Sequence, residues 1–181
     1  ASFQNVGGMN NVNVTNDKGN FAFANFGGMN DVNIGNKNSA NASLYNEGGM
    51  HSVNATNNAA NFSFQNTGGM ESVGLTNTGR GNAQIVNNGG MNTISTNTQV
   101  AYTQIANFGG LGTLNAKDQW DDTHIFNTGD IGTANLTAIG AKGYVGLQNA
   151  GNIENLNANA KSGGIIDIDN QEGYIRDFWA Q

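Results

Sequence analysis

Residues 21–36 read FAFANFGGMNDVNIGN, and this stretch decides the fold. Apolar residues alternate with small or polar ones before Asn25 and again from Val32 to Asn36, and two Gly stand between the two alternating stretches. Alternation over about five residues that is bounded by Gly and Asn is typical of a half-buried β-strand. The stretch therefore predicts a strand, a Gly-Gly turn and a second strand.

The same unit recurs along most of the chain, with an Asn followed two residues later by a Gly at steps of 20 to 22 residues. The repeated Asn are Asn5, Asn25, Asn46, Asn66, Asn87, Asn107, Asn127 and Asn149. Their turn Gly are Gly7, Gly27, Gly48, Gly68, Gly89, Gly109, Gly129 and Gly151. A nearly constant period brings equal residues into register only if each unit lies on the one before it. We therefore predict an all-β, parallel β-solenoid of about eight to nine strand–turn–strand rungs.

Stacking turns each repeated position into a column of side chains along the rod. The expected core joins a column of Phe and aliphatic residues to a facing column of Met: Phe3, Phe23, Leu44, Phe64, Ile85, Met9, Met29, Met50, Met70 and Met91. The repeated Asn are expected to bond amide to amide between rungs, as Asn ladders do in stacked cross-β structures. We expect the turn Gly to be required for backbone conformations of positive φ.

The composition excludes several classes of protein. The 181 residues include 27 Gly but no Pro and no Cys, which excludes a disulfide scaffold, a thiolate metal site and a cysteine nucleophile. Pro would remove a donor from nearly any stacked strand, which accounts for its absence. The 7 basic residues are scattered, so no nucleic acid partner is expected. No apolar run reaches the ~18 residues of a membrane helix, so no membrane insertion is expected.

Residues with catalytic or metal-binding chemistry are few. His51 shares its column with Asn10 and Asn30, so we expect an outward polar side chain. The stretch Asp121-Asp122-Thr123-His124 contains ligand types for a metal, but a solvated loop is the preferred interpretation. No Ser, His and acid recur as a triad, and no pair of carboxylates recurs. The sequence predicts no enzyme, no catalytic residue, no metal site and no cofactor.

The carboxy-terminal part differs from the repeats. Both Trp and most of the 13 acidic residues lie after residue 116, and the Asn-x-Gly register fails from Ala160. We expect residues 1–160 to form the solenoid and residues 161–181 to form a degenerate final rung, a cap or a docking segment. Docking would use Tyr174, Phe178 and Trp179, since aromatic residues are enriched in interface cores.

The full motif is an Asn, a Gly at +2, often an Asn at +5, an aliphatic residue at +7 and often an Asn at +11. It resembles the curlin repeat of the curli fibre subunits, closely over about residues 1–100 and loosely over 101–160. It departs from that repeat in its Asn for Gln, its Met at +4, its shorter period and its larger residue at +7.

The resemblance implies a secreted subunit, extracellular or at the cell surface, that polymerises head to tail with itself into functional amyloid of a biofilm matrix. It also implies secretion or nucleation proteins as partners.

Two alternatives stay open. One is a monomeric or trimeric solenoid that serves as an adhesin or as a spacer in a fibre. The other is an ice-binding solenoid, which needs a regular outward array of Thr. The column at +10 contains Thr15, Thr56 and Thr76, but Gly35 and Asn97 interrupt it.

Overall fold

The computed structural model describes residues 1–38, 41–58 and 60–181, and in this part of the chain every regular element is a β-strand. None of these residues belongs to a helix that is long and apolar enough to cross a membrane. The strands are β1 (Ser2–Asn5), β2 (Met9–Asn16), β3 (Asn20–Asn25), β4 (Met29–Asn36), β5 (Asn41–Asn46), β6 (Met50–Asn57), β7 (Phe62–Asn66), β8 (Met70–Asn77), β9 (Ala83–Asn87), β10 (Met91–Thr98), β11 (Thr103–Asn107), β12 (Leu111–Asp118), β13 (Asp122–Asn127), β14 (Ile131–Ile139), β15 (Tyr144–Asn149), β16 (Ile153–Lys161), β17 (Ile165–Asn170) and β18 (Ile175–Ala180).

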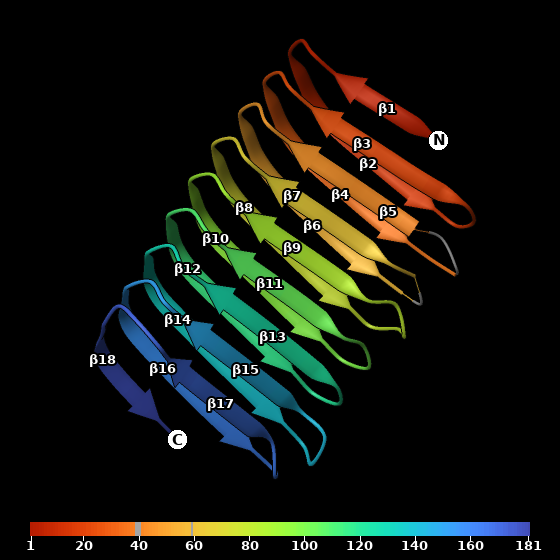
Figure 1. Ribbon diagram of the computed structural model, residues 1–181. Coiled ribbons are helices and arrows are strands. Elements are labelled where there is room, and N and C mark those ends of the chain that lie inside the picture. The colour runs from red at the N-terminus through yellow and green to blue at the C-terminus, as the bar shows by residue number, and fades with distance from the viewer. Residues whose placement is uncertain (39–40, 59) are drawn as a thin grey trace.

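The strands form two parallel sheets that face each other (Figure 1). The odd-numbered strands make one sheet and the even-numbered strands the other, and in both sheets the spatial order follows the chain. Each odd strand and the even strand after it form one rung, so the described residues contain nine rungs. The first and last rungs lie at opposite ends of the rod. The predicted parallel β-solenoid is confirmed.

The register confirms the predicted columns and places the core between the sheets. Phe23 lies beside Leu44, and Leu44 beside Phe64, in neighbouring strands of the odd sheet. These side chains are buried, as are the Met residues from Met29 onward in the even sheet. Each buried side chain of this size contributes roughly 1.5–3 kcal/mol. Because every inner rung packs on two others, the core runs unbroken along the rod.

Two predicted core residues are not fully buried, although Met9 packs against the core. Phe3 is 41% exposed, and Met9 is only half-buried. Both lie in the first rung, which has a neighbouring rung on one side only. The ring of Phe3 stacks on Phe23 with 5.4 Å between centroids, but its other face has no partner rung.

Of the two arcs that join the sheets, one has a constant length and the other a variable length. We call the segment from an odd strand to the next even strand the first arc, and the return to the next odd strand the second arc. In the first eight rungs, the first arc and the even strand after it keep a constant length. The number of residues from the repeated Asn to the last aligned position of that strand is always the same, as from Asn25 to Asn36 and from Asn107 to Asp118. The second arc is variable, and all variation of the period in these rungs lies there.

The turn Gly are required for space, and the expectation of positive φ is wrong. Among the described glycines, positive φ occurs at Gly19, Gly140, Gly163 and Gly173, which are not turn Gly of the repeat. Instead, a Cβ on Gly109 would lie far inside van der Waals contact of the Gly89 carbonyl oxygen in the preceding rung. The same contact recurs at the other turn Gly except Gly7, which has no rung before it.

The segment 161–181 continues both sheets as a ninth rung. β17 pairs with β15, and β18 pairs with β16. Ile166, Ile168 and Ile175 pack against the core and are only partly buried, because no further rung covers them.

Candidate functional site

A continuous ladder of Asn side chains runs through the core beside the first arc. In each step the amide Nδ2 of one Asn donates a hydrogen bond of 2.7–2.9 Å to the Oδ1 of the Asn in the next rung. The ladder comprises the eight predicted Asn and continues to Asn170. In most rungs the same Nδ2 also donates to a carbonyl of its own arc, as from Asn25 to Gly27 at 2.9 Å. The predicted Asn ladder is confirmed, and it satisfies amides that burial would otherwise make costly.

The ladder has a direction, because the rung nearer the N-terminus always donates. At the first rung, Asn5 Oδ1 accepts no hydrogen bond from any described residue. At the last rung, Asn170 Nδ2 reaches only its own arc, at 3.5 Å from the Gly173 carbonyl oxygen. The rod therefore ends in a free acceptor at one end and a weakly used donor at the other.

Both ends also leave sheet edges without a partner. β1 and β2 are the edge strands at one end, and β17 and β18 are the edge strands at the other. Such edges present backbone donors and acceptors that pair readily with another strand.

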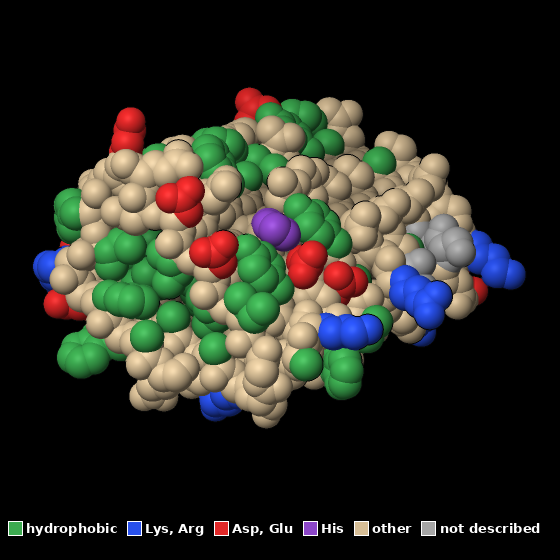
Figure 2. All heavy atoms as spheres, turned by 60° about the horizontal axis from the view of Figure 1, so that its bottom comes forward, with side chains coloured by type: hydrophobic (Ala, Val, Ile, Leu, Met, Phe, Trp, Pro, Cys, Tyr) green, Lys and Arg blue, Asp and Glu red, His purple; other side chains and the backbone are tan. Residues whose placement is uncertain are grey.

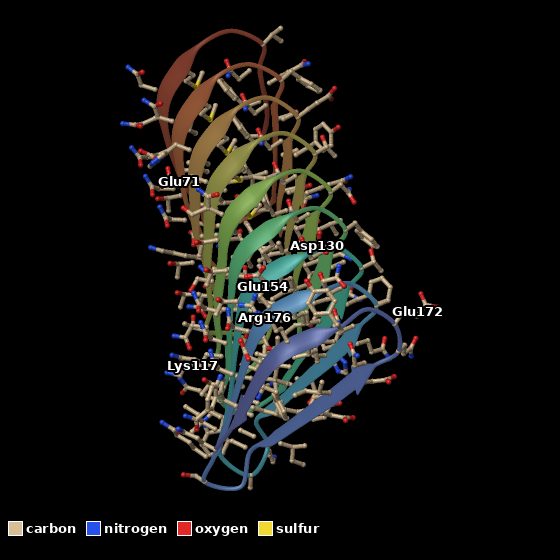
Figure 3. All side chains as sticks on the ribbon, turned by 90° about the vertical axis from the view of Figure 1, so that its left-hand side faces the viewer. Glu71, Lys117, Asp130, Glu154, Glu172 and Arg176 are labelled. Carbon is tan, nitrogen blue, oxygen red and sulfur yellow. The ribbon has the colours of Figure 1, made fainter. Side chains whose placement is uncertain are left out.

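Figure 3 shows Arg176 of β18 near Glu154 of β16 on neighbouring rungs, where Nη2 lies 3.9 Å from Oε2.

The three aromatic residues of the proposed docking end are all exposed, but their positions differ. Phe178 is in register with the buried Leu156, so it lies in a column of the core that ends here. Trp179 is in register with Asn157, in an outward column. Tyr174 lies in the first arc of the last rung. Only Phe178 is therefore placed to cover a core column of another rod.

A second ladder lines the second arc in the first four rungs, with bonds of 2.8–3.0 Å in the same direction. It consists of Asn16, Asn36, Asn57 and Asn77. Thr98 and then Asp118 continue this column, and Ala138 follows. The amide ladder thus ends about half-way along the rod, where hydroxyl and carboxyl hydrogen bonds replace it, between Thr98 and Thr103 at 2.7 Å and from Thr123 to Asp118 at 3.0 Å.

Asp118 is a carboxyl group in this core column, with 0% of its surface exposed. Burial raises the pKa of Asp118 to about 6, and the nearby charges of Asp121 and Asp122 act in the same direction. Hydrogen bonds from the Asp121 backbone N–H at 3.1 Å and from Thr123 Oγ1 at 3.0 Å oppose the rise. The expectation of a solvated loop over residues 121–124 is wrong from Asp122 onward, because β13 begins at Asp122 and Thr123 is buried.

His51 is exposed, as expected for its outward column, and lies between two carboxylates of neighbouring rungs. Its Nδ1 is 2.8 Å from Asp31 Oδ1, and its Nε2 is 2.6 Å from Glu71 Oε2. The hydrogen bond to His51 lowers the pKa of Asp31. The bond to Asp31 and the charge of Glu71 raise the pKa of His51. Alignment of the repeats places Glu71 in the column of His51, whereas Asp31 lies in the next column, beside Ser52. As an exposed set, the trio contributes little to stability.

His124 lies on the outer face of the odd sheet between two tyrosines. Its ring centroid is 5.3 Å from that of Tyr102 and 5.4 Å from that of Tyr144. Tyr144 Oη donates a hydrogen bond of 3.3 Å to Asp167 Oδ2, and burial, followed by the charge of Asp167, raises the pKa of Tyr144. Figure 2 shows a face on which a histidine lies among hydrophobic side chains, with acidic side chains on both sides.

Sequence analysis did not predict this cluster, because its members come from four different repeats and become neighbours only when the rungs stack. Within the described ranges, no three His, Asp or Glu side chains are grouped so that they could hold a metal ion. Comparisons with protein-family models, with curated proteins and with solved structures found no match to this chain.

Proposed function

We propose that the chain is a structural subunit that stacks end to end with copies of itself into an extracellular, curli-like fibre. The observation that carries the proposal is the direction of the Asn ladder. The last rung offers an amide donor at Asn170, and the first rung offers an amide acceptor at Asn5. A second copy placed on the last rung in the internal register would join the two ladders with one further bond of the same kind.

The internal register also defines which strands would meet. With Asn5 of the next copy on Asn170, β1 of that copy pairs with β17, and β2 pairs with β18. Phe3 then covers Ile168, whose column it shares, and Val12 covers Phe178. Exposed apolar surface at both ends would be buried, and open backbone edges would be paired, as in other forms of strand addition.

The junction therefore repeats the contacts that hold the rungs together inside each subunit. The resemblance to the curlin repeat supports secretion and a place in an extracellular matrix. It also supports helper proteins for secretion or nucleation.

The test compares fibre growth of the wild type with that of two variants that carry the same change of charge. Asn170→Asp replaces the donor by a carboxylate that would face the side-chain Oδ1 of Asn5 in the next copy. Asn92→Asp makes the same substitution at an exposed position of the outer face. The loss of one buried hydrogen bond costs about 1–3 kcal/mol, which corresponds to roughly 5- to 150-fold in junction affinity.

We expect wild type and Asn92→Asp to form fibres with a meridional diffraction spacing of about 4.8 Å. Asn170→Asp should elongate at least fivefold more slowly, although its circular dichroism stays that of the wild-type monomer. Equal growth of the two variants would reject the ladder junction. A wild type that stays monomeric or trimeric at all concentrations would reject the fibre and favour a solenoid spacer.

A further inference from the structure

A shallow groove of about 330 Å³ opens on the outer face of the odd sheet, between β11 and β17. Its floor is the backbone of β13 and β15 near Ile125 and Leu147, whose side chains are buried. Gly146 lies in this floor, and the Tyr144 ring extends over it. A Cβ on Gly146 would lie 2.9 Å from the end of that ring. The glycine thus makes the space that the ring and the groove share.

The side chains around the groove are of two kinds. Aromatic rings come from the stack of Tyr102, His124 and Tyr144 and from Phe126, which is 39% exposed. Carboxylates come from Asp167 and, on the same strand, Asp169. The amides of Gln104 and Gln148 complete the lining.

These side chains are not needed for the stacking of rungs. In the first half of the rod, the column that contains His124 has Ser43 and Ser63 instead, and those rungs stack in the same way. Tyr144 likewise has counterparts of smaller size, such as Asn41. Tyr45 of β5 packs on Phe26 and bonds to Glu47 in the earlier rungs, but among the described residues only the face around His124 adds an imidazole to aromatic and carboxyl groups.

We propose that this groove binds an oligosaccharide of amino sugars. The apolar C–H face of a pyranose ring packs on aromatic side chains, and its hydroxyl groups pair with carboxamide and carboxylate oxygens. An ammonium group on the sugar fits Asp167 and Asp169 by charge, and it is attracted to the tyrosine rings as a cation. Sugars with carboxylate groups would be repelled by the same acids.

The shape of the site agrees with a chain-like ligand. β11, β13, β15 and β17 are successive strands, so the groove spans three rung spacings, or about 14 Å along the rod. Its volume of about 330 Å³ lies at the lower end of the range that is usual for small-ligand sites. The inference does not depend on fibre formation, because all of these residues lie within one copy.

The test measures binding of three soluble tetrasaccharides to the monomeric protein by calorimetry at pH 6. The probes are a glucosamine tetramer, a neutral glucose tetramer and a uronic acid tetramer. Gly146→Ala displaces the Tyr144 ring into the groove, and Asp167→Asn removes one carboxylate. Asp130→Asn, an exposed residue in the first arc, makes the same change of charge outside the groove.

We expect the glucosamine tetramer to bind at least tenfold more tightly than the uronic acid tetramer. Gly146→Ala and Asp167→Asn should each weaken its binding at least fivefold, and Asp130→Asn should leave it within twofold. Circular dichroism shows whether each variant folds, and Tyr144→Phe, which loses only the hydroxyl group, replaces any variant that does not.

Absence of binding by all three probes would reject the site. Binding that 0.5 M salt abolishes and Gly146→Ala leaves unchanged would show unspecific attraction to the acidic surface, and would also reject it. Fibres that form while no glycan binds would reject this inference and leave the proposed function intact.

Discussion

Replacement of Asp118 by Asn should stabilise the protein above pH 6 and remove a pH dependence that the wild type has between about pH 4 and pH 6. Asp118 is buried in a column that holds Asn in the first four rungs, so an amide of nearly equal size fits the site. The amide can still accept the Asp121 backbone N–H through Oδ1. It carries no charge that burial must disfavour.

The direction in which the free energy of unfolding changes with pH follows from the direction of the pKa shift of Asp118. Burial raises the pKa of Asp118 to about 6 in the folded protein, against 3.8 as the ordinary value. The folded protein therefore keeps the proton over a range in which the unfolded chain has lost it. The contribution of Asp118 to the free energy of unfolding is therefore highest below about pH 4, falls as the pH rises to about 6, and stays at the lower value above. The full shift would correspond to about 3 kcal/mol at 1.36 kcal/mol per unit, and screening by water near Asp121 and Asp122 reduces this to about 2 kcal/mol.

The assay is urea unfolding of dilute monomer, followed by circular dichroism at several pH values from 3.5 to 7.5. We expect the free energy of unfolding of Asp118→Asn to exceed that of wild type by about 2 kcal/mol at pH 7 and to equal it near pH 3.5. Asp130→Asn serves as the control for the change in net charge and should follow wild type. A difference that is the same at all pH values, or a variant less stable than wild type at pH 7, would refute the reasoning.

Three further changes test the stacking. Gly109→Ala should cost about 1–3 kcal/mol or more in the same assay, because its Cβ meets the carbonyl of the preceding arc, whereas Gly110→Ala has open space and should change stability by less than about 1 kcal/mol. Asn87→Ala should cost about 1–3 kcal/mol by leaving buried partners in two rungs unpaired, and the exposed Asn92→Ala should be nearly neutral by thermal melting. Thr96→Val should raise the melting temperature, because the Thr96 hydroxyl is buried without a hydrogen-bond partner among the described residues and its removal gains about 1 kcal/mol. Equal effects within either pair, or a lower melting temperature for the Val variant, would contradict these expectations.

The repeat made most of the fold predictable. A period that returns Asn66 and Asn87 to equivalent positions leaves few arrangements other than a stacked solenoid, and the alternation in each unit sets which side chains face inward. The ladder followed because a buried amide with an identical amide above and below it has both a donor and an acceptor within reach.

What the sequence did not predict lies where the repeat is broken or ends. Phe3 has the residue type of the core but lies at an end of the rod, and periodicity contains no information about ends. The reason for the turn Gly is a contact between rungs, which local turn preferences do not describe. Asp118 and the ring stack at His124 depend on single replacements in columns, whose meaning appears only when residues about 20 positions apart lie side by side.

The difference between the two arcs has a consequence for how the sequence of such a rod can evolve. The first arcs do not tolerate an added residue, because it would bring a side chain or a displaced glycine against the carbonyl oxygen of the neighbouring arc. The second arcs already contain insertions of one or two residues, and the strands on both sides stay in register. Among the described first arcs only the last, before Ile175, is longer, and no described rung follows it. The second arcs are therefore the positions at which loops or whole domains could be gained or lost during evolution. The stacked strands, and any assembly built on them, would stay the same.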